Sequence, residues 1–141
     1  MRVSAPFMTL TGFAVRRGLP AAGSAPAPPA AGALPYAPVI QQITANGSGG
    51  VTITWIYAAA GDTTVDLADG VTSVSTSTLT PAIYHSTTNG AGLSGTKVTA
   101  SAGATSHTFT AGAGSPRYFV MTAENAVGES EQSAQRAATI T

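Results

Sequence analysis

The 141-residue sequence contains no cysteine, and only 9% of its residues are charged, against roughly a quarter in an average globular protein. Without cysteine the chain has no disulfide, thiolate zinc site or cysteine nucleophile, although this does not tell which redox compartment holds it. Six basic and six acidic side chains are too few for a coiled coil, a charged disordered tail or a basic nucleic-acid-binding patch. No apolar run approaches the roughly 20 residues of a membrane span. We therefore expect neither nucleic acid as a partner nor a membrane span.

Acidic residues are also absent from the first 61 positions, which carry only Arg2, Arg16 and Arg17. The remainder holds all six carboxylates and three basic residues. The zero net charge thus divides into an N-terminal part of +3 and a remainder of −3.

Seven of the nine prolines precede Val39, and residues 18–38 read GLPAAGSAPAPPAAGALPYAP. Proline has no amide donor and favours extended geometry in its predecessor, so this composition predicts a semi-rigid polyproline-II-like linker. Residues 1–17 differ, because an apolar strip ends at two arginines. We expect an anchoring arm that docks on another subunit, its contact residues being Phe7, Met8, Leu10, Phe13, Arg16 and Arg17. A cleaved signal peptide and a disordered terminus are the alternatives.

From Val39 onward, short β-type runs alternate with glycine-rich turns, and no window has helical periodicity. Apolar residues in Val51–Tyr57 recur every second position, as in a half-buried strand. Asn46-Gly47 predicts a type I′ hairpin turn before this run, because both central positions of that turn need positive φ. The predicted strands are 39–45, 51–57, 82–88, 96–101, 106–110, 117–124 and 135–140, an all-β pattern without helices.

Residues 117–130, RYFVMTAENAVGES, resemble the F strand and F–G turn of a fibronectin type III domain. The motif residues are Ala123, Asn125, Gly128, Glu129 and Ser130, and Trp55 resembles the tryptophan that ends the family's B strand. This resemblance implies a seven-stranded antiparallel β-sandwich of the fibronectin type III or immunoglobulin-like kind over residues 39–141, behind an extended N-terminal arm. The predicted core residues are Val51, Ile53, Trp55, Ile83, Phe109, Phe119 and Met121.

The sequence departs from the family pattern in two places. Arg117 occupies the position where the family has its corner tyrosine, with Tyr118 beside it, so either the register is bulged or the corner hydrogen bond is missing. The B–C connection, residues 58–80, is long for a structureless loop. We expect an extra hairpin there, with Asp69-Gly70 turning between its strands.

The sequence gives little support for a nucleotide-binding or metal-binding site. Residues 90–95 spell G-x-G-x-x-G, but a strand pattern follows where a dinucleotide site needs a helix. His85 and His107 have no second ligand nearby, and the acidic cluster of residues 62–69 lacks the ligand spacing of an EF-hand. We predict a non-enzyme without catalytic residues, metal or cofactor.

Two functions remain. The first is a structural or decorating protein of a larger assembly, resembling fibronectin-type modules on bacteriophage capsids and tails, which would place it on a virion surface. Its partners would be other subunits, bound through residues 1–17, with weak contacts of the sandwich loops to host glycans or proteins. The second is a secreted or cell-surface module that binds carbohydrate or protein through its B–C, C–C′ and F–G loops.

Overall fold

The computed structural model describes residues 33–58 and 61–141. The anchoring arm, residues 1–17, and residues 18–32 of the linker lie outside this part of the chain. So do the arm residues Phe7, Met8, Leu10, Phe13, Arg16 and Arg17. Predictions about them stay predictions.

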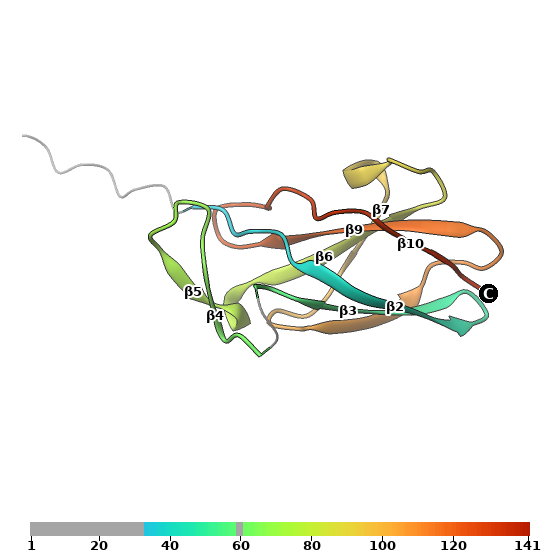
Figure 1. Ribbon diagram of the computed structural model, residues 1–141, viewed down its shortest axis with the longest axis horizontal. Helices are drawn as coiled ribbons and strands as arrows, with labels where there is room; N and C mark the ends of the chain where they lie inside the picture. Colours follow the sequence, from blue (N-terminus) through green and yellow to red (C-terminus); the bar gives the residue numbers. More distant parts are fainter. Residues whose placement is uncertain (1–32, 59–60) are drawn as a thin grey trace, which may run out of the picture. The chain divides into compact units, whose positions relative to one another are not determined.

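Two antiparallel sheets form the sandwich, and a two-stranded sheet lies in the B–C connection (Figure 1). The three-stranded sheet has the order β2-β3-β8, built from Val39–Gly47, Gly50–Ile56 and Ser106–Thr110. The four-stranded sheet has the order β10-β9-β6-β7, built from Arg136–Thr139, Pro116–Glu124, Thr80–Ser86 and Thr96–Thr99. In chain order these seven strands correspond to A, B, C, C′, E, F and G of a fibronectin type III sandwich, as expected. Within the described residues, the only helical elements are two three-residue 3₁₀ turns, Thr76–Thr78 and Gly92–Ser94.

The core lies between the sheets, and β3 shows why its sequence forms a strand there. Val51 and Ile53 are fully buried and Trp55 is 2% exposed, while the threonines between them face outward. From the other sheet Ile83, Phe119 and Met121 are fully buried against them. Phe109, also predicted for the core, is only partly buried and packs on its edge.

The turn between β2 and β3 differs from the sequence prediction. Gly47 pairs with Gly50, so Ser48 and Gly49 are the central residues of the turn. Their φ angles, 51° and 81°, are both positive, as type I′ geometry requires. Asn46 and Gly47 instead lie at a register shift after Ala45. The Asn-Gly pair thus marks an irregularity two residues before the turn.

The long B–C connection contains the expected hairpin. Strands β4, Thr64–Asp66, and β5, Ser73–Ser75, pair antiparallel. In the loop between them, Asp69 Oδ1 accepts hydrogen bonds from the backbone N–H of Val71 and Thr72, both at 2.9 Å. This cap fixes the turn at Asp69-Gly70.

Residues 33–38, assigned to the linker by their composition, are attached to the sandwich. Pro35 and Pro38 are buried, and the Leu34 carbonyl accepts a 2.9 Å hydrogen bond from Ala68 N–H. The Ala33 carbonyl accepts another from Asn125 Nδ2. The last six linker residues therefore belong to the domain.

These bonds bring three segments together at one end of the domain, which we call the linker end: residues 33–36, the hairpin loop 67–72 and the F–G turn 124–128 (Figure 1). The β2–β3 turn and the C-terminal residues meet at the opposite, distal end, where Gly49 N–H donates to the Thr141 carbonyl. The C–C′ loop, 87–95, follows β6 at its distal end. The three predicted binding loops thus do not share one end.

Candidate functional site

The residues of the predicted family motif build the F–G turn and its surroundings. Asn125 Oδ1 accepts hydrogen bonds from the N–H groups of Val127 and Gly128, at 2.9 and 3.1 Å, and so closes the turn. Its Nδ2 donates to the Ala33 carbonyl. Gly128 has a φ of +158°, and a β-carbon at this position would lie 3.3 Å from Leu34 Cδ2. Both the backbone angle and the close contact favour glycine here. This turn therefore joins residues 33–34 to the sandwich.

Ser130 and Ser133 precede β10 in the chain, and they hydrogen-bond to the backbone of β9 beyond the part that β10 pairs with. Ser130 Oγ accepts a hydrogen bond from Ala123 N–H, and Ser130 N–H donates to the Ala123 carbonyl. Ser133 makes the same pair of bonds with Met121. Two serine side chains thus satisfy buried backbone donors that a regular ladder would otherwise satisfy.

Glu129 lies at the centre of a polar network on the outer face of the four-stranded sheet. Its Oε2 accepts hydrogen bonds from Tyr84 Oη and Thr122 Oγ1, both at 2.6 Å. Lys97 Nζ donates to Oε1 at 3.1 Å, lies 3.9 Å from the Glu124 carboxylate and sits over the Tyr84 ring. The network links three strands to the segment after the F–G turn.

The network changes the pKa values of its members. Burial opposes ionisation of Glu129, but the bonds from Thr122, Tyr84 and Lys97 outweigh it and lower the pKa of this carboxyl. The pKa of Tyr84 is raised, first by burial and then by its bond to Glu129. The pKa of Lys97 is raised because its bonds to Glu129 and Tyr84 outweigh burial. The ionised pair is thus the stable form.

His85 is buried inside the sandwich and Arg117 is half-buried, which their sequence positions did not reveal. His85 is 6% exposed, with ring centroids 5.4 Å from Phe109 and 6.2 Å from Phe119. Its Nδ1 and Arg117 Nε are buried and have no hydrogen-bond partner among residues 33–58 and 61–141. Burial, and then the Arg117 charge, lower the pKa of His85. His85 therefore packs on the inner face of β6.

No corner bond replaces the missing tyrosine. Arg117 stands at that position, and the Tyr118 hydroxyl makes no hydrogen bond within the described part of the chain. Counted back from Asn125, every second residue of β9 should face the core. Met121 and Phe119 are fully buried and β9 pairs with β6 without a register shift, so the register is not bulged there. Of the two alternatives, the missing corner bond is the one observed.

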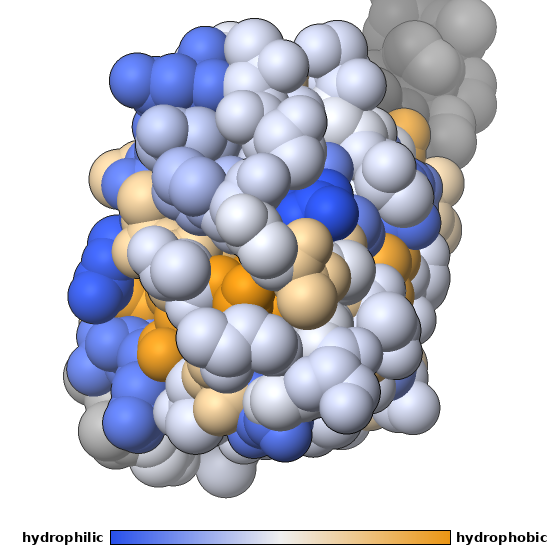
Figure 2. Space-filling model, turned by 90° about the vertical axis from the view of Figure 1, so that its right-hand side faces the viewer, coloured by the Kyte–Doolittle hydropathy of each residue, from blue (hydrophilic) through white to orange (hydrophobic). Residues whose placement is uncertain are grey.

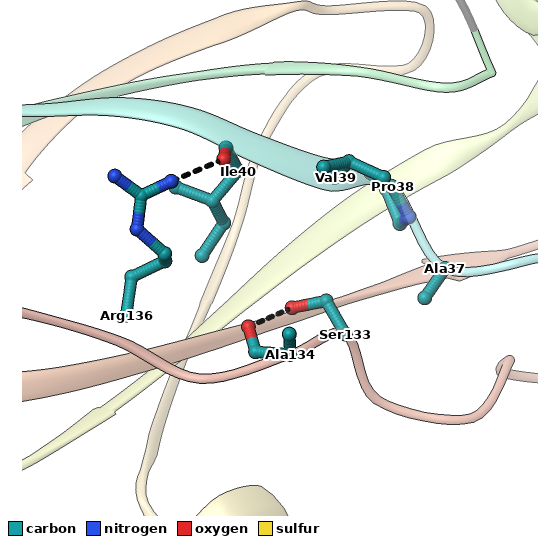
Figure 3. A pocket seen from close by; sticks show the side chains of 7 residues that line it. All are labelled: Ala37, Pro38, Val39, Ile40, Ser133, Ala134 and Arg136. Atoms are coloured by element: carbon teal, nitrogen blue, oxygen red, sulfur yellow. Dashed lines mark hydrogen bonds between the residues drawn. The ribbon is translucent and has the colours of Figure 1, made fainter.

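A groove of about 280 Å³ separates β2 from the segment before β10 (Figure 3). One side is formed by residues 37–40 and the other by Ser133, Ala134 and Arg136. Arg136 Nη1 crosses it to donate to the Ile40 carbonyl at 2.8 Å, as the dashed line in Figure 3 shows. A second cavity, about 410 Å³, lies beside Trp55, Tyr57, Asp62 and Thr76.

Large apolar side chains are exposed mainly at the linker end. Leu34, Tyr36, Val71 and Val127 are 38%, 58%, 85% and 47% exposed. Leu93, 45% exposed, lies in the C–C′ loop instead. The distal end faces the viewer in Figure 2, where residues of intermediate hydropathy predominate and some hydrophilic and hydrophobic residues lie among them. The two ends of the domain therefore differ in chemistry.

The glycine motif of residues 90–95 opens no helix longer than the 3₁₀ turn Gly92–Ser94, and β7 follows it. Over residues 33–58 and 61–141, no three His, Cys, Asp or Glu side chains gather as a metal site would require. Nor does any helix in these ranges have the length and apolar character to span a bilayer.

No family model matches the sequence, and no curated protein matches it. Among solved structures, a β-1,2-glucanase from Parabacteroides distasonis is similar, with a TM-score of 0.48 and 21% identity over 77% of this chain. The matched region spans only 14% of the glucanase. An Fn3-like protein from Clostridium thermocellum matches 77% of this chain and 96% of its own, with a TM-score of 0.46 and 22% identity. No residue role in this chain follows from either similarity.

Proposed function

We propose that the protein is a non-catalytic interaction module, a β-sandwich that residues 1–17 attach to a larger assembly. The observation that carries the proposal is the position of the exposed apolar side chains. Of the six large ones in the described part of the chain, four lie at the linker end and a fifth, Val39, lies at the start of β2. Exposed apolar side chains that gather in one region mark an interaction surface.

The hydrogen bonds of the motif residues support a structural role. Asn125, Glu129 and Ser130 bind backbone groups and neighbouring side chains that hold the F–G region together. Their polar atoms are occupied by the fold itself. The motif therefore explains how the domain is built and leaves interaction to the rest of its surface.

In its finer form, the proposal places the domain on the surface of a bacteriophage capsid or tail. Its basis is the arm sequence, which is apolar but does not read as a signal peptide, together with a proline-rich spacer. Fifteen residues, 18–32, separate the arm from the domain. At about 3.1 Å each in polyproline II they reach about 45 Å.

The alternative is a secreted accessory module that binds carbohydrate or protein. The observation in its favour is the 410 Å³ cavity beside Trp55, Tyr57 and Asp62, where aromatic and polar side chains meet next to the B–C hairpin. The mass of the mature N-terminus separates the two functions. Cleavage between residues 25 and 33 supports secretion, whereas an N-terminus intact apart from Met1 supports the assembly arm.

Deletion of residues 1–17 tests the attachment. The shortened chain should keep the circular dichroism spectrum of the intact chain, because the core of β3, β6 and β9 is untouched. It should no longer co-sediment with the particles of its native source. As a length-matched control, a chain with Phe7, Met8, Leu10 and Phe13 replaced by serine should behave like the deletion. Stoichiometric co-sedimentation of the shortened chain would refute the arm's role.

A further inference from the structure

All six acidic side chains lie in residues 62–69 and 124–131. Asp69 and Glu124 belong to the linker end, and the other four lie in the segments that adjoin it in sequence. Lys97 pairs with Glu124 and Glu129. Asp66, Asp69 and Glu131 make no ion pair with any described residue. Of the other two basic residues of the domain, Arg117 lies close to Gly112 near the distal end, and Arg136 donates to the Ile40 carbonyl of β2. The carboxylates of the domain therefore lie in the linker end and in the segments that adjoin it in sequence.

Apolar side chains lie among these carboxylates. Leu34 connects the two loops of this end, because its carbonyl accepts from Ala68 N–H and its Cδ2 lies close to Gly128. Val127 is the neighbour of Gly128 in the F–G turn, and Val71 follows Asp69-Gly70 in the hairpin loop. Val71 and Val127 are 85% and 47% exposed. An apolar surface with an acidic border fits a segment that is both apolar and basic.

Residues 1–17 are such a segment. They contain Phe7, Met8, Leu10 and Phe13, carry Arg2, Arg16 and Arg17, and have no acidic residue. Nowhere else does the sequence combine apolar residues with positive charge in this way. The proline-rich composition of residues 18–32 predicts a semi-rigid linker, and we therefore take a neighbouring molecule as the acceptor of the arm.

We propose that the linker end binds residues 1–17 of a second copy of this chain. The contact surface consists of Leu34, Val71 and Val127 with the carboxylates around them. This inference rests on the proposed function and names both the arm's partner and its docking surface. The contact is heterologous, since each copy offers an arm and accepts a different one. Repetition therefore produces rings or open chains rather than a two-fold dimer.

A complementation experiment tests the proposal with two chains. A chain lacking residues 1–17 keeps the docking surface, and a full-length chain with Val71→Asp and Val127→Asp keeps the arm. In sedimentation velocity each should be monomeric alone, and an equimolar mixture should form a one-to-one complex. The wild-type chain should form larger species as its concentration rises. Circular dichroism of each chain establishes that it is folded.

Two further measurements test where and how the arm binds. Leu93→Asp places the same charge on an exposed apolar residue outside the linker end and should leave association unchanged. Val71→Asp and Val127→Asp together should weaken it by about tenfold or more. Arg16→Glu with Arg17→Glu should also weaken it, and 0.5 M salt should weaken wild-type association by screening, to a Debye length of about 4 Å. Equal loss with Leu93→Asp would overturn the assigned surface.

Failure of this inference differs from failure of the proposed function. A wild-type chain that stays monomeric at every concentration, or a mixture that forms no complex, overturns docking between copies. If the deleted chain then still fails to co-sediment with native particles, the arm binds another protein and the proposed function stands. If the deleted chain co-sediments as well as the intact one, the proposed function fails too.

Discussion

Glu129, half-buried just after the F–G turn, accepts three side-chain hydrogen bonds. Tyr84, Thr122 and Lys97 all donate to its two carboxylate oxygens. These donors come from β6, β9 and β7, so one carboxylate joins three strands of the sheet. The glutamate of the Gly-Glu-Ser motif is thereby explained as a structural group.

Replacing Glu129 with glutamine should destabilise the domain by about 1–2 kcal/mol at neutral pH, since a charged acceptor of three bonds is lost. The lowered pKa means that the folded state favours the ionised carboxylate. Its contribution is therefore present above pH 4.5, the ordinary value, and disappears as the pH falls through the lower folded-state value. In urea unfolding, the difference between wild type and Glu129→Gln should shrink from pH 7 to pH 3.

Glu131→Gln is the matched control, because Glu131 makes no ion pair within residues 61–141. It should change the unfolding free energy little at either pH. A wild-type-to-Glu129→Gln difference that is the same at pH 7 and pH 3 would show that ionisation of Glu129 adds nothing.

Trp55 is the largest side chain of the core and is 2% exposed. Trp55→Ala should lower the unfolding free energy by about 3–5 kcal/mol, through lost apolar burial and the cavity left behind. Tyr36→Ala, at a position 58% exposed, should change it by less than about 0.5 kcal/mol. Thermal melting followed by circular dichroism measures both, since the variant lacks the only tryptophan. A melting temperature within a degree or two of wild type would show that this core assignment is wrong.

The β2–β3 connection shows what a turn needs beyond a favourable residue pair. Gly47 and Gly49 have nearly equal φ angles, 83° and 81°, yet their surroundings differ. A β-carbon at Gly49 would lie 2.9 Å from both Ala113 N and Gly112 Cα, whereas one at Gly47 would meet nothing within 4 Å. The backbone after β8 therefore packs directly on this turn.

Gly47→Ala should destabilise the domain by about 1–2 kcal/mol, the cost of a left-handed conformation for a residue with a β-carbon. Gly49→Ala should cost clearly more, because backbone atoms must also move. Chemical denaturation of the two variants compares strain alone with strain plus close contact. Equal losses would contradict the close approach of residues 112 and 113.

At the scale of the whole domain, the two ends differ in their exposed side chains. The linker end gathers most exposed apolar side chains, while backbone bonds among residues 49, 114, 140 and 141 close the distal end. Figure 2 shows that residues of intermediate hydropathy cover much of that end, with hydrophilic and hydrophobic residues among them. The acidic residues, which all follow position 61 in the sequence, lie in or next to the segments of the linker end, and the proposed docking of a basic arm uses this distribution.

The sequence by itself determined the strands, because alternation of apolar and polar residues is a local property. It identified the run around Trp55, the motif from Ala123 to Ser130 and the hairpin at Asp69-Gly70. Those signals require only neighbours in the chain. Fold class and most of the core could therefore be predicted.

The tertiary structure decided what depends on distant residues. The β2–β3 turn lies at Ser48-Gly49, and not at the predicted Asn46-Gly47, because the register between the two strands selects it. Residues 33–38 belong to the domain because Asn125 and Ala68 donate hydrogen bonds to the Ala33 and Leu34 carbonyls. His85 became a core residue because Phe109 and Phe119 meet it from two sheets. The linker end likewise exists only where three segments far apart in the sequence come together. Contacts between such segments leave no periodic pattern, and so the surface that we propose for docking could be found only in the fold.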